Sequence, residues 1–176
     1  SGIEITETNS GCICCSLVGD FGEALHKVLT DLAPDRILIE PSGVGKLSDV
    51  IRAVQGAETA GASLGSLTTV ADASKCKMYI KNFGEFYNTQ IEHATTIILS
   101  RTGGMAQEKL DAAVALLREK NADATIITTP WEELDGKQIR AAMEKEDTLK
   151  EALAKLAAEQ EDVCPVCGGH HHDHEH

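Results

Sequence analysis

The sequence predicts an α/β fold in which a mostly parallel sheet is flanked by helices. Short apolar or β-branched runs bounded by turn residues are typical of buried parallel strands, and they lie at residues 36–40, 67–73, 96–100 and 124–129. Between them, apolar side chains recur at helical spacing in residues 18–32, 46–55 and 105–119. Strands that alternate with helices of this length predict parallel pairing, because the helices serve as crossover connections.

Polar or turn-forming residues follow three of the predicted strands. They are residues 40–43, Asp72, and residues 100–102. In open parallel sheets the ligand binds beyond the carboxyl ends of the strands. The sequence therefore predicts that these three segments contribute to one binding site.

Composition divides the chain into three parts. Residues 1–133 carry the strand and helix pattern, and we expect them to form the main domain. Residues 134–162 are rich in Ala, Glu, Lys and Leu, which is typical of solvated helices. Residues 163–176 are rich in Cys and His and cannot pack a core, so we expect a disordered tail.

The chain is acidic, with 16 Lys and Arg against 28 Asp and Glu among 176 residues and a formal net charge of −12. Such a surface repels phosphate backbones and anionic lipid, so nucleic acid and membranes are not expected partners. No apolar run approaches the ~20 residues that span a bilayer, and residues 1–7 do not resemble a signal peptide. We expect a soluble, cytoplasmic protein that attracts cations.

A cluster of thiols, Cys12, Cys14 and Cys15, lies in the segment GCICCSL. One local turn can direct all three at a single ion, and Zn²⁺ or Cu⁺ prefers such ligands. A fourth ligand would be a carboxylate, a His or water. The alternative is that these small apolar thiols pack at a strand-to-helix junction, as buried free cysteines often do. The other two single residues of note, Cys76 and His93, are interpreted as packed structural side chains.

The tail forms a second candidate metal site. It combines a CxxC pair with five histidines, namely Cys164, Cys167, His170, His171, His172, His174 and His176. Dense imidazole and thiolate ligands bind Zn²⁺, Co²⁺ or Ni²⁺ with little selectivity. The alternatives are an expression tag, which the interleaved Asp173 and Glu175 disfavour, and a solubilising end.

The segments GCICCSL, ILIEPSGVGKLSDV, VADAS and QIEHATTIILSRTGG resemble, in that order, the CobW group of P-loop GTPases, which includes the CobW/HypB/UreG-like proteins. The resemblance covers residues 1 to 130, roughly. It implies a P-loop NTPase G domain that binds GTP and Mg²⁺ and acts as a zinc or cobalt metallochaperone. It also implies that CxCC is the metal site. Metal ions, a guanine nucleotide and an unidentified client metalloprotein are the implied partners.

The same resemblance assigns the segment ILIEPSG to a Walker B strand and its loop. Glu40 would then be the catalytic residue that holds the Mg²⁺ shell, with Ser42 beside it. The Gly43 amide would face the γ-phosphate, because a residue without a side chain lets the backbone approach. The alternative reading of Glu40 is a turn or helix-cap carboxylate.

Two departures from the family pattern stand out. The motif GxxGxGK[ST] is absent, and Lys46 follows the wrong strand to replace its lysine. We expect the chain, which starts at Ser1, to begin after the P-loop and to be inactive alone. The guanine-reading motif Asn-Lys-x-Asp is replaced by SRTG, so Ser100 and Arg101 remain as nucleotide contacts without the carboxylate, and Arg101 can instead stack on a purine.

Two functions fit these residues. The first is a metallochaperone-type GTPase in which the nucleotide gates metal binding and transfer. The second is a metal-binding or sensing module without enzymatic activity, whose nucleotide site is degenerate. The intact EPSG segment favours the first function, and the altered SRTG segment favours the second.

Overall fold

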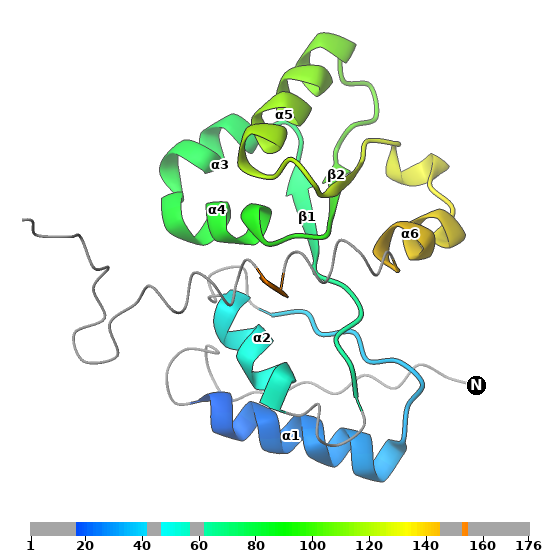
Figure 1. Cartoon of the computed structure of the whole chain (residues 1–176). Helices are drawn as coiled ribbons and strands as arrows, with labels where there is room; N and C mark the ends of the chain where they lie inside the picture. The colour runs from blue at the N-terminus through cyan, green and yellow to red at the C-terminus, as the bar shows by residue number, and fades with distance from the viewer. Residues whose placement is uncertain (1–16, 42–46, 57–61, 145–152, 155–176) are drawn as a thin grey trace, which may run out of the picture. The chain divides into compact units, whose positions relative to one another are not determined.

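The structure is a computed structural model, and it describes residues 17–41, 47–56, 62–144 and 153–154. The chain divides into two compact units, Ser1–Leu64 and Gly65–His176 (Figure 1). None of the helices in the described ranges is long and apolar enough to cross a bilayer.

The first unit contains two helices at the positions that the sequence predicts. Helix α1 spans Leu17–Leu32 and helix α2 spans Leu47–Gly56. Their apolar faces pack together, and this contact buries Leu25 and Val54. Leu29 and residues of the intervening segment complete this small core.

The segment 36–40 lies in the first unit and is not the buried parallel strand that the sequence predicts. No part of it is assigned to a strand, and Leu38 is 80% exposed. Ile37 and Ile39 instead pack against the core of α1 and α2. Alternate side chains thus face inward, as in a strand. However, a strand is completed only by backbone hydrogen bonds to a neighbour, and this segment forms no ladder within the described residues.

The second unit is built on a parallel sheet with strand order β1-β2-β3. Strand β1 spans Thr68–Asp72, β2 spans Thr96–Ser100, and β3 spans Thr125–Ile127. The register pairs Thr68 with Thr96 and Asp72 with Ser100. Three of the four predicted strands are therefore confirmed, and the parallel α/β class with them.

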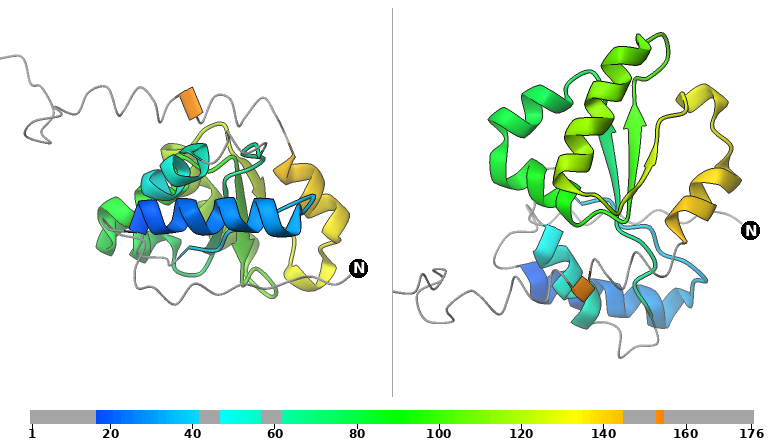
Figure 2. Two further views of the ribbon diagram at one scale, coloured as in Figure 1. Left: turned by 90° about the horizontal axis from the view of Figure 1, so that it is seen from below. Right: turned by 45° about the horizontal axis from the view of Figure 1, so that its top comes forward.

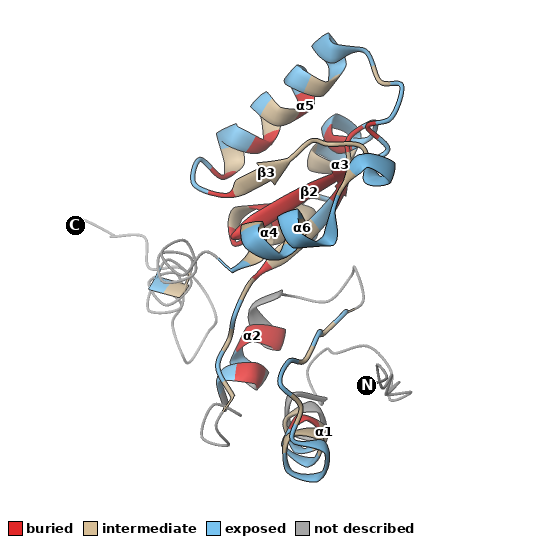
Figure 3. Cartoon of the chain, turned by 90° about the vertical axis from the view of Figure 1, so that its right-hand side faces the viewer, coloured by how far each residue is buried: buried red, intermediate tan, exposed pale blue. Residues whose placement is uncertain are grey.

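Three helices cover one face of this sheet: α3 (Cys76–Asn82), α4 (Gly84–Glu92) and α5 (Gln107–Lys120) (Figures 1 and 2). Helix α5 was predicted, whereas α3 and α4 were not. The core lies between the sheet and these helices, and Ile97 and Leu99 of β2 meet Ile91 and Leu117 there. Strand β2 is buried along most of its length (Figure 3).

Helix α6 spans Gly136–Met143 and lies on the other side of the sheet (Figure 2). Thr96 Oγ1 donates a hydrogen bond to the carbonyl of Ala142 at 2.9 Å, which ties α6 to β2. The helix begins with a capping box, in which Asp135 and Gln138 satisfy each other's backbone amides. No residue of α6 is buried, as expected for a solvated helix.

Asn121 joins the end of α5 to the sheet. Its side-chain amide donates to the carbonyls of Ile91 and Ala94, each at 2.8 Å, and its oxygen accepts from the amide of Ala124 at 2.9 Å. These bonds satisfy backbone groups that end α4 and begin β3, in a side chain that is 7% exposed. His93 lies at the carboxyl end of α4 and is 2% exposed, as expected of a packed side chain.

Candidate functional site

The carboxyl ends of β1 and β2 lie side by side because the two strands are parallel and in register. Asp72 ends β1 and is the register partner of Ser100, which ends β2. The Ser100 hydroxyl donates to the carbonyl of Ala71 at 3.3 Å, so it bonds to the neighbouring strand. The structure thus brings together two of the three segments that the sequence predicts at the strand ends.

Arg101 leaves β2 in a left-handed conformation, with φ of 60°. For a residue with a side chain this conformation costs on the order of 1 kcal/mol. Its Nε lies 3.3 Å from Asp72 Oδ2, so the turn directs the guanidinium back over the end of β1. The Arg101 side chain is 71% exposed and that of Asp72 only 13%. One edge of the guanidinium is held, and its flat face remains accessible.

Asp72 is fixed by three groups. Its Oδ1 accepts hydrogen bonds from both the backbone amide and the hydroxyl of Ser74, and its Oδ2 pairs with Arg101. Burial raises the pKa of Asp72, but the Ser74 hydrogen bonds and the positive charges of Arg101 and Lys75 outweigh it. The net pKa of Asp72 lies below its ordinary value of 3.8, and the carboxylate is therefore charged at neutral pH.

The loop after Arg101 contains a buried hydroxyl group. Thr102 is 6% exposed, and its Oγ1 has no hydrogen-bond partner among the described residues. Its backbone carbonyl accepts from the amide of Met105 at 3.0 Å, which closes the turn toward α5. Gly103 follows, at the place where the family pattern has a carboxylate. This loop can offer the guanidinium face of Arg101 to a ligand, but no acid.

Glu40 lies in the first unit, where it ends the extended segment that follows α1. Its carboxylate is exposed to solvent. Mg²⁺ sites in nucleotide enzymes use one or two carboxylates together with the phosphates of the substrate, so the donor chemistry of Glu40 fits this ion. Ser42 and Gly43 lie outside the described residues.

The remaining predicted metal ligands also lie outside the described residues. They are the thiols Cys12, Cys14 and Cys15 and the seven Cys and His side chains of residues 164–176. In the part of the chain that the structure describes, no three His, Cys, Asp or Glu side chains gather closely enough to hold a metal ion. Cys76 is 1% exposed, as predicted, and its thiol donates to the Asp72 carbonyl at 3.2 Å.

The sequence predicts Asp72 as a strand-end carboxylate, but it does not predict the hydrogen bonds and the ion pair that this carboxylate forms. The signal was present for Ser74, because an Asp side chain often accepts from the amide two residues later. No comparable signal identified the contact with Arg101, which joins two strand ends 29 residues apart in the sequence. Only the register of β1 against β2 brings these side chains together.

The second unit is thus a parallel α/β sheet with a polar site at its strand ends, which is the class of fold that binds nucleotides. The family model of the CobW/HypB/UreG nucleotide-binding domain matches residues 1–128. The chain therefore belongs to the CobW/HypB/UreG family, and the resemblance that the motifs indicate is confirmed.

Among curated proteins the chain is similar to the zinc-regulated GTPase metalloprotein activator 1 of Schizosaccharomyces pombe. The two are 26% identical over 130 residues, which is 72% of this chain and 32% of that protein. The chain thus spans about a third of the length of this relative. No solved structure matches the chain.

Proposed function

We propose that the chain is part of the nucleotide-binding domain of a metal-handling GTPase. In this proposal, nucleotide binding at the strand ends controls a thiophilic metal held by Cys12, Cys14 and Cys15. The observation that carries the proposal is the family match over residues 1–128, a range that contains the CxCC motif and both strand-end loops. The name of the S. pombe relative, a zinc-regulated GTPase, supports zinc as the metal.

The nucleotide part of the proposal assigns roles to four residues. Arg101 stacks its exposed guanidinium face on the purine, and its ion pair with Asp72 keeps the side chain in place. Glu40 binds Mg²⁺, and Gly43 lies against the γ-phosphate. GTP hydrolysis and delivery of the metal to a client metalloprotein are proposed for the intact protein. A change of order in the loop around Glu40 would alter the affinity of the thiols.

The metal part is tested by titrating Zn²⁺ against a competing chelator. The chain is shortened to residues 1–160, so that the tail ligands do not contribute. Replacing Cys12, Cys14 and Cys15 together by Ser should weaken zinc binding by roughly three orders of magnitude or more, because thiolates supply most of the binding free energy of such sites.

Cys76→Ser is the matched control, since it removes one thiol that is buried in the second unit. It should leave zinc affinity unchanged. If the triple variant binds zinc as tightly as the parent, the metal site lies elsewhere and the proposal fails.

A second function, a metal-binding or sensing module without turnover, is favoured by the loop after β2. Gly103 stands where a guanine-reading carboxylate is expected, and Arg101 is engaged by Asp72. A fluorescent GDP analogue distinguishes the two functions. Saturable binding that Arg101→Ala weakens supports the GTPase domain, whereas normal zinc binding without nucleotide binding supports the module.

The 176-residue chain contains no GxxGxGK[ST] segment. Loss of one preorganised donor to a transition state already costs on the order of 3 kcal/mol, and this loop supplies several donors and a lysine. We therefore expect no GTP turnover above background from this chain, with or without Zn²⁺. Turnover at the rate of an intact P-loop enzyme, abolished by Glu40→Ala, would contradict this account of the chain.

A further inference from the structure

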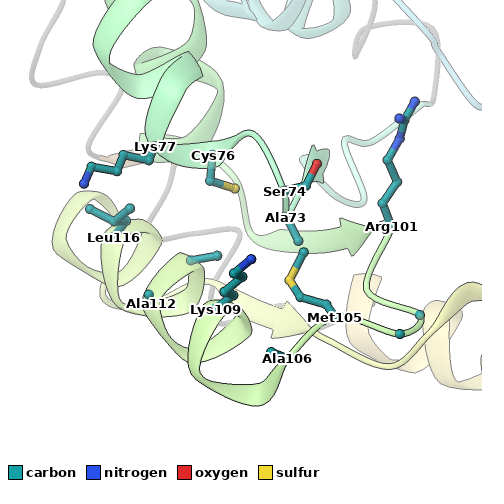
Figure 4. A pocket seen from close by; sticks show the side chains of 13 residues that line it. Ala73, Ser74, Cys76, Lys77, Arg101, Met105, Ala106, Lys109, Ala112 and Leu116 are labelled. Atoms are coloured by element: carbon teal, nitrogen blue, oxygen red, sulfur yellow. The ribbon is translucent and has the colours of Figure 1, made fainter.

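A groove of about 490 Å³ lies in the second unit between α3, α5 and the loop after β2 (Figure 4). Its walls come from the end of β1 and the start of α3, from Arg101 and residues 103–106, and from the face of α5 between Lys109 and Leu116. That face covers seven residue steps, or about 10 Å along the helix axis. The volume is in the range of small-molecule sites, and the groove is longer than one phosphate group.

The lining of this groove carries positive charge only. Three of its side chains are cations, Lys77, Lys109 and Arg101, and none is a carboxylate. The chain as a whole has a net charge of −12, so the positive charge of the groove is opposite in sign to the net charge of the chain. Arg101 is paired with Asp72, but within the described residues neither Lys77 nor Lys109 forms an ion pair.

Between the cations the walls are apolar or small. Ala73, Met105, Ala112 and Leu116 face the groove, and the small side chains leave the space open. Cys76 adds no negative charge, because burial raises the pKa of its thiol. Figure 4 shows Lys77 and Arg101 toward opposite ends of the groove and Lys109 between them. A complementary ligand therefore has anionic groups that are separated by an apolar body.

We propose that the groove between α3 and α5 binds a small organic dianion, with its two acidic groups held by Lys77 and Lys109 and its apolar body against Ala112 and Leu116. Arg101 lines this groove and also belongs to the proposed nucleotide site, so the dianion site adjoins the nucleotide site and uses other charged groups. Neither lysine has a part in the proposed function, so the two proposals stand or fall separately.

The test uses the full 176-residue chain, labelled with ¹⁵N and free of metal and nucleotide. Octanedioate is the probe, because it places a carboxylate at each end of an apolar chain. Octanoate, with one carboxylate, is the matched ligand control. We expect saturable amide shifts at Ala73, Met105 and Ala113 with octanedioate, weaker binding of octanoate, and loss of affinity as NaCl is raised.

Replacing Lys77 and Lys109 together by Gln should weaken octanedioate binding about tenfold, which is the sum expected of two solvent-exposed ion pairs. Gln preserves helix propensity, so the fold should persist. Lys81→Gln is the matched protein control, because Lys81 lies on α3 but does not line the groove; it should change affinity less than about twofold. The proposal is overturned if octanedioate gives no saturable shifts, or if the double variant binds as tightly as Lys81→Gln.

Discussion

The two units of this chain differ in their backbone hydrogen bonding and in the size of their cores. The second unit has a ladder of three parallel strands and a core that includes Ile97 and Leu117, both 0% exposed. In the described part of the first unit, two helices and an extended segment share a smaller core around Leu25 and Val54. The second unit is therefore the more extensively paired scaffold, and the proposed thiol ligands and Glu40 belong to the first unit.

This difference separates two kinds of prediction. Residues that the ladder positions, such as Asp72 and Arg101, have a geometry that can be stated and tested at the level of single contacts. The thiols of the first unit are proposed as metal ligands from their sequence motif. Substitutions of Leu117, Asn121 and Asp72 test the contrast.

Leu117→Ala should be the most damaging of these changes. It removes a fully buried side chain from the core of the second unit, so the free energy of unfolding should fall by about 3 kcal/mol. Leu25→Ala, in the smaller core of the first unit, should cost less. Urea unfolding followed by circular dichroism gives these values.

The matched control is Leu38→Ala, because Leu38 is 80% exposed. It should change the free energy of unfolding by no more than about 0.5 kcal/mol. Equal costs for Leu25→Ala and Leu117→Ala would show that the first unit has as substantial a core as the second. That result would remove the contrast between the first and the second unit.

Asn121→Ala should come second, at about 2 kcal/mol. The change leaves the buried carbonyls of Ile91 and Ala94 and the amide of Ala124 without their partner. Asn82→Ala, at the exposed end of α3, is the control and should be close to neutral. If Asn121→Ala is also neutral, the hydrogen bonds of this side chain do not stabilise the connection of α4 to β3. The contrast in stability between the two units would then be smaller than we expect.

Asp72→Asn should have the smallest effect, less than about 1 kcal/mol, because its partner Arg101 is exposed. The substitution keeps the oxygen that accepts from Ser74 and removes only the charge. Since folding lowers the pKa of Asp72, the charge stabilises the fold above the ordinary pKa of 3.8, and this contribution is lost as pH falls through the lower folded value.

Urea midpoints of the parent and Asp72→Asn should therefore differ by the same amount at about pH 7 and about pH 5, and converge below the ordinary pKa. Asp123→Asn is the charge-matched control, because Asp123 is exposed. If Asp72→Asn is instead more stable than the parent at about pH 7 and this advantage is lost as the pH falls, the fold raises the pKa of Asp72.

The sequence predicts the three paired strands well because each is a short apolar run bounded by turns and flanked by a helix. It predicts residues 36–40 by the same pattern and is wrong there, since pattern alone does not supply a pairing partner. Helices α3 and α4 escape prediction because they are short and are interrupted at Phe83 and Gly84, the latter with φ of 33°.

The candidate site is predicted in part for a related reason. Strand ends can be located from local sequence, so the sequence predicts Asp72, Ser100 and Arg101 as strand-end residues. The ion pair across β1 and β2 and the groove along α5 depend on register and helix packing, which join residues far apart in the chain. Local sequence carries no record of either.

Strand β1 pairs with β2 on one side only within the described residues, and its Val70 is 64% exposed. Backbone amides at such an edge meet water directly, so they should exchange with deuterium faster than those of β2, which has a partner on both sides. An edge of this kind also accepts any extended segment that reaches it. At high protein concentration the segment would come from a neighbouring molecule, and the molar mass measured by light scattering would then rise with concentration.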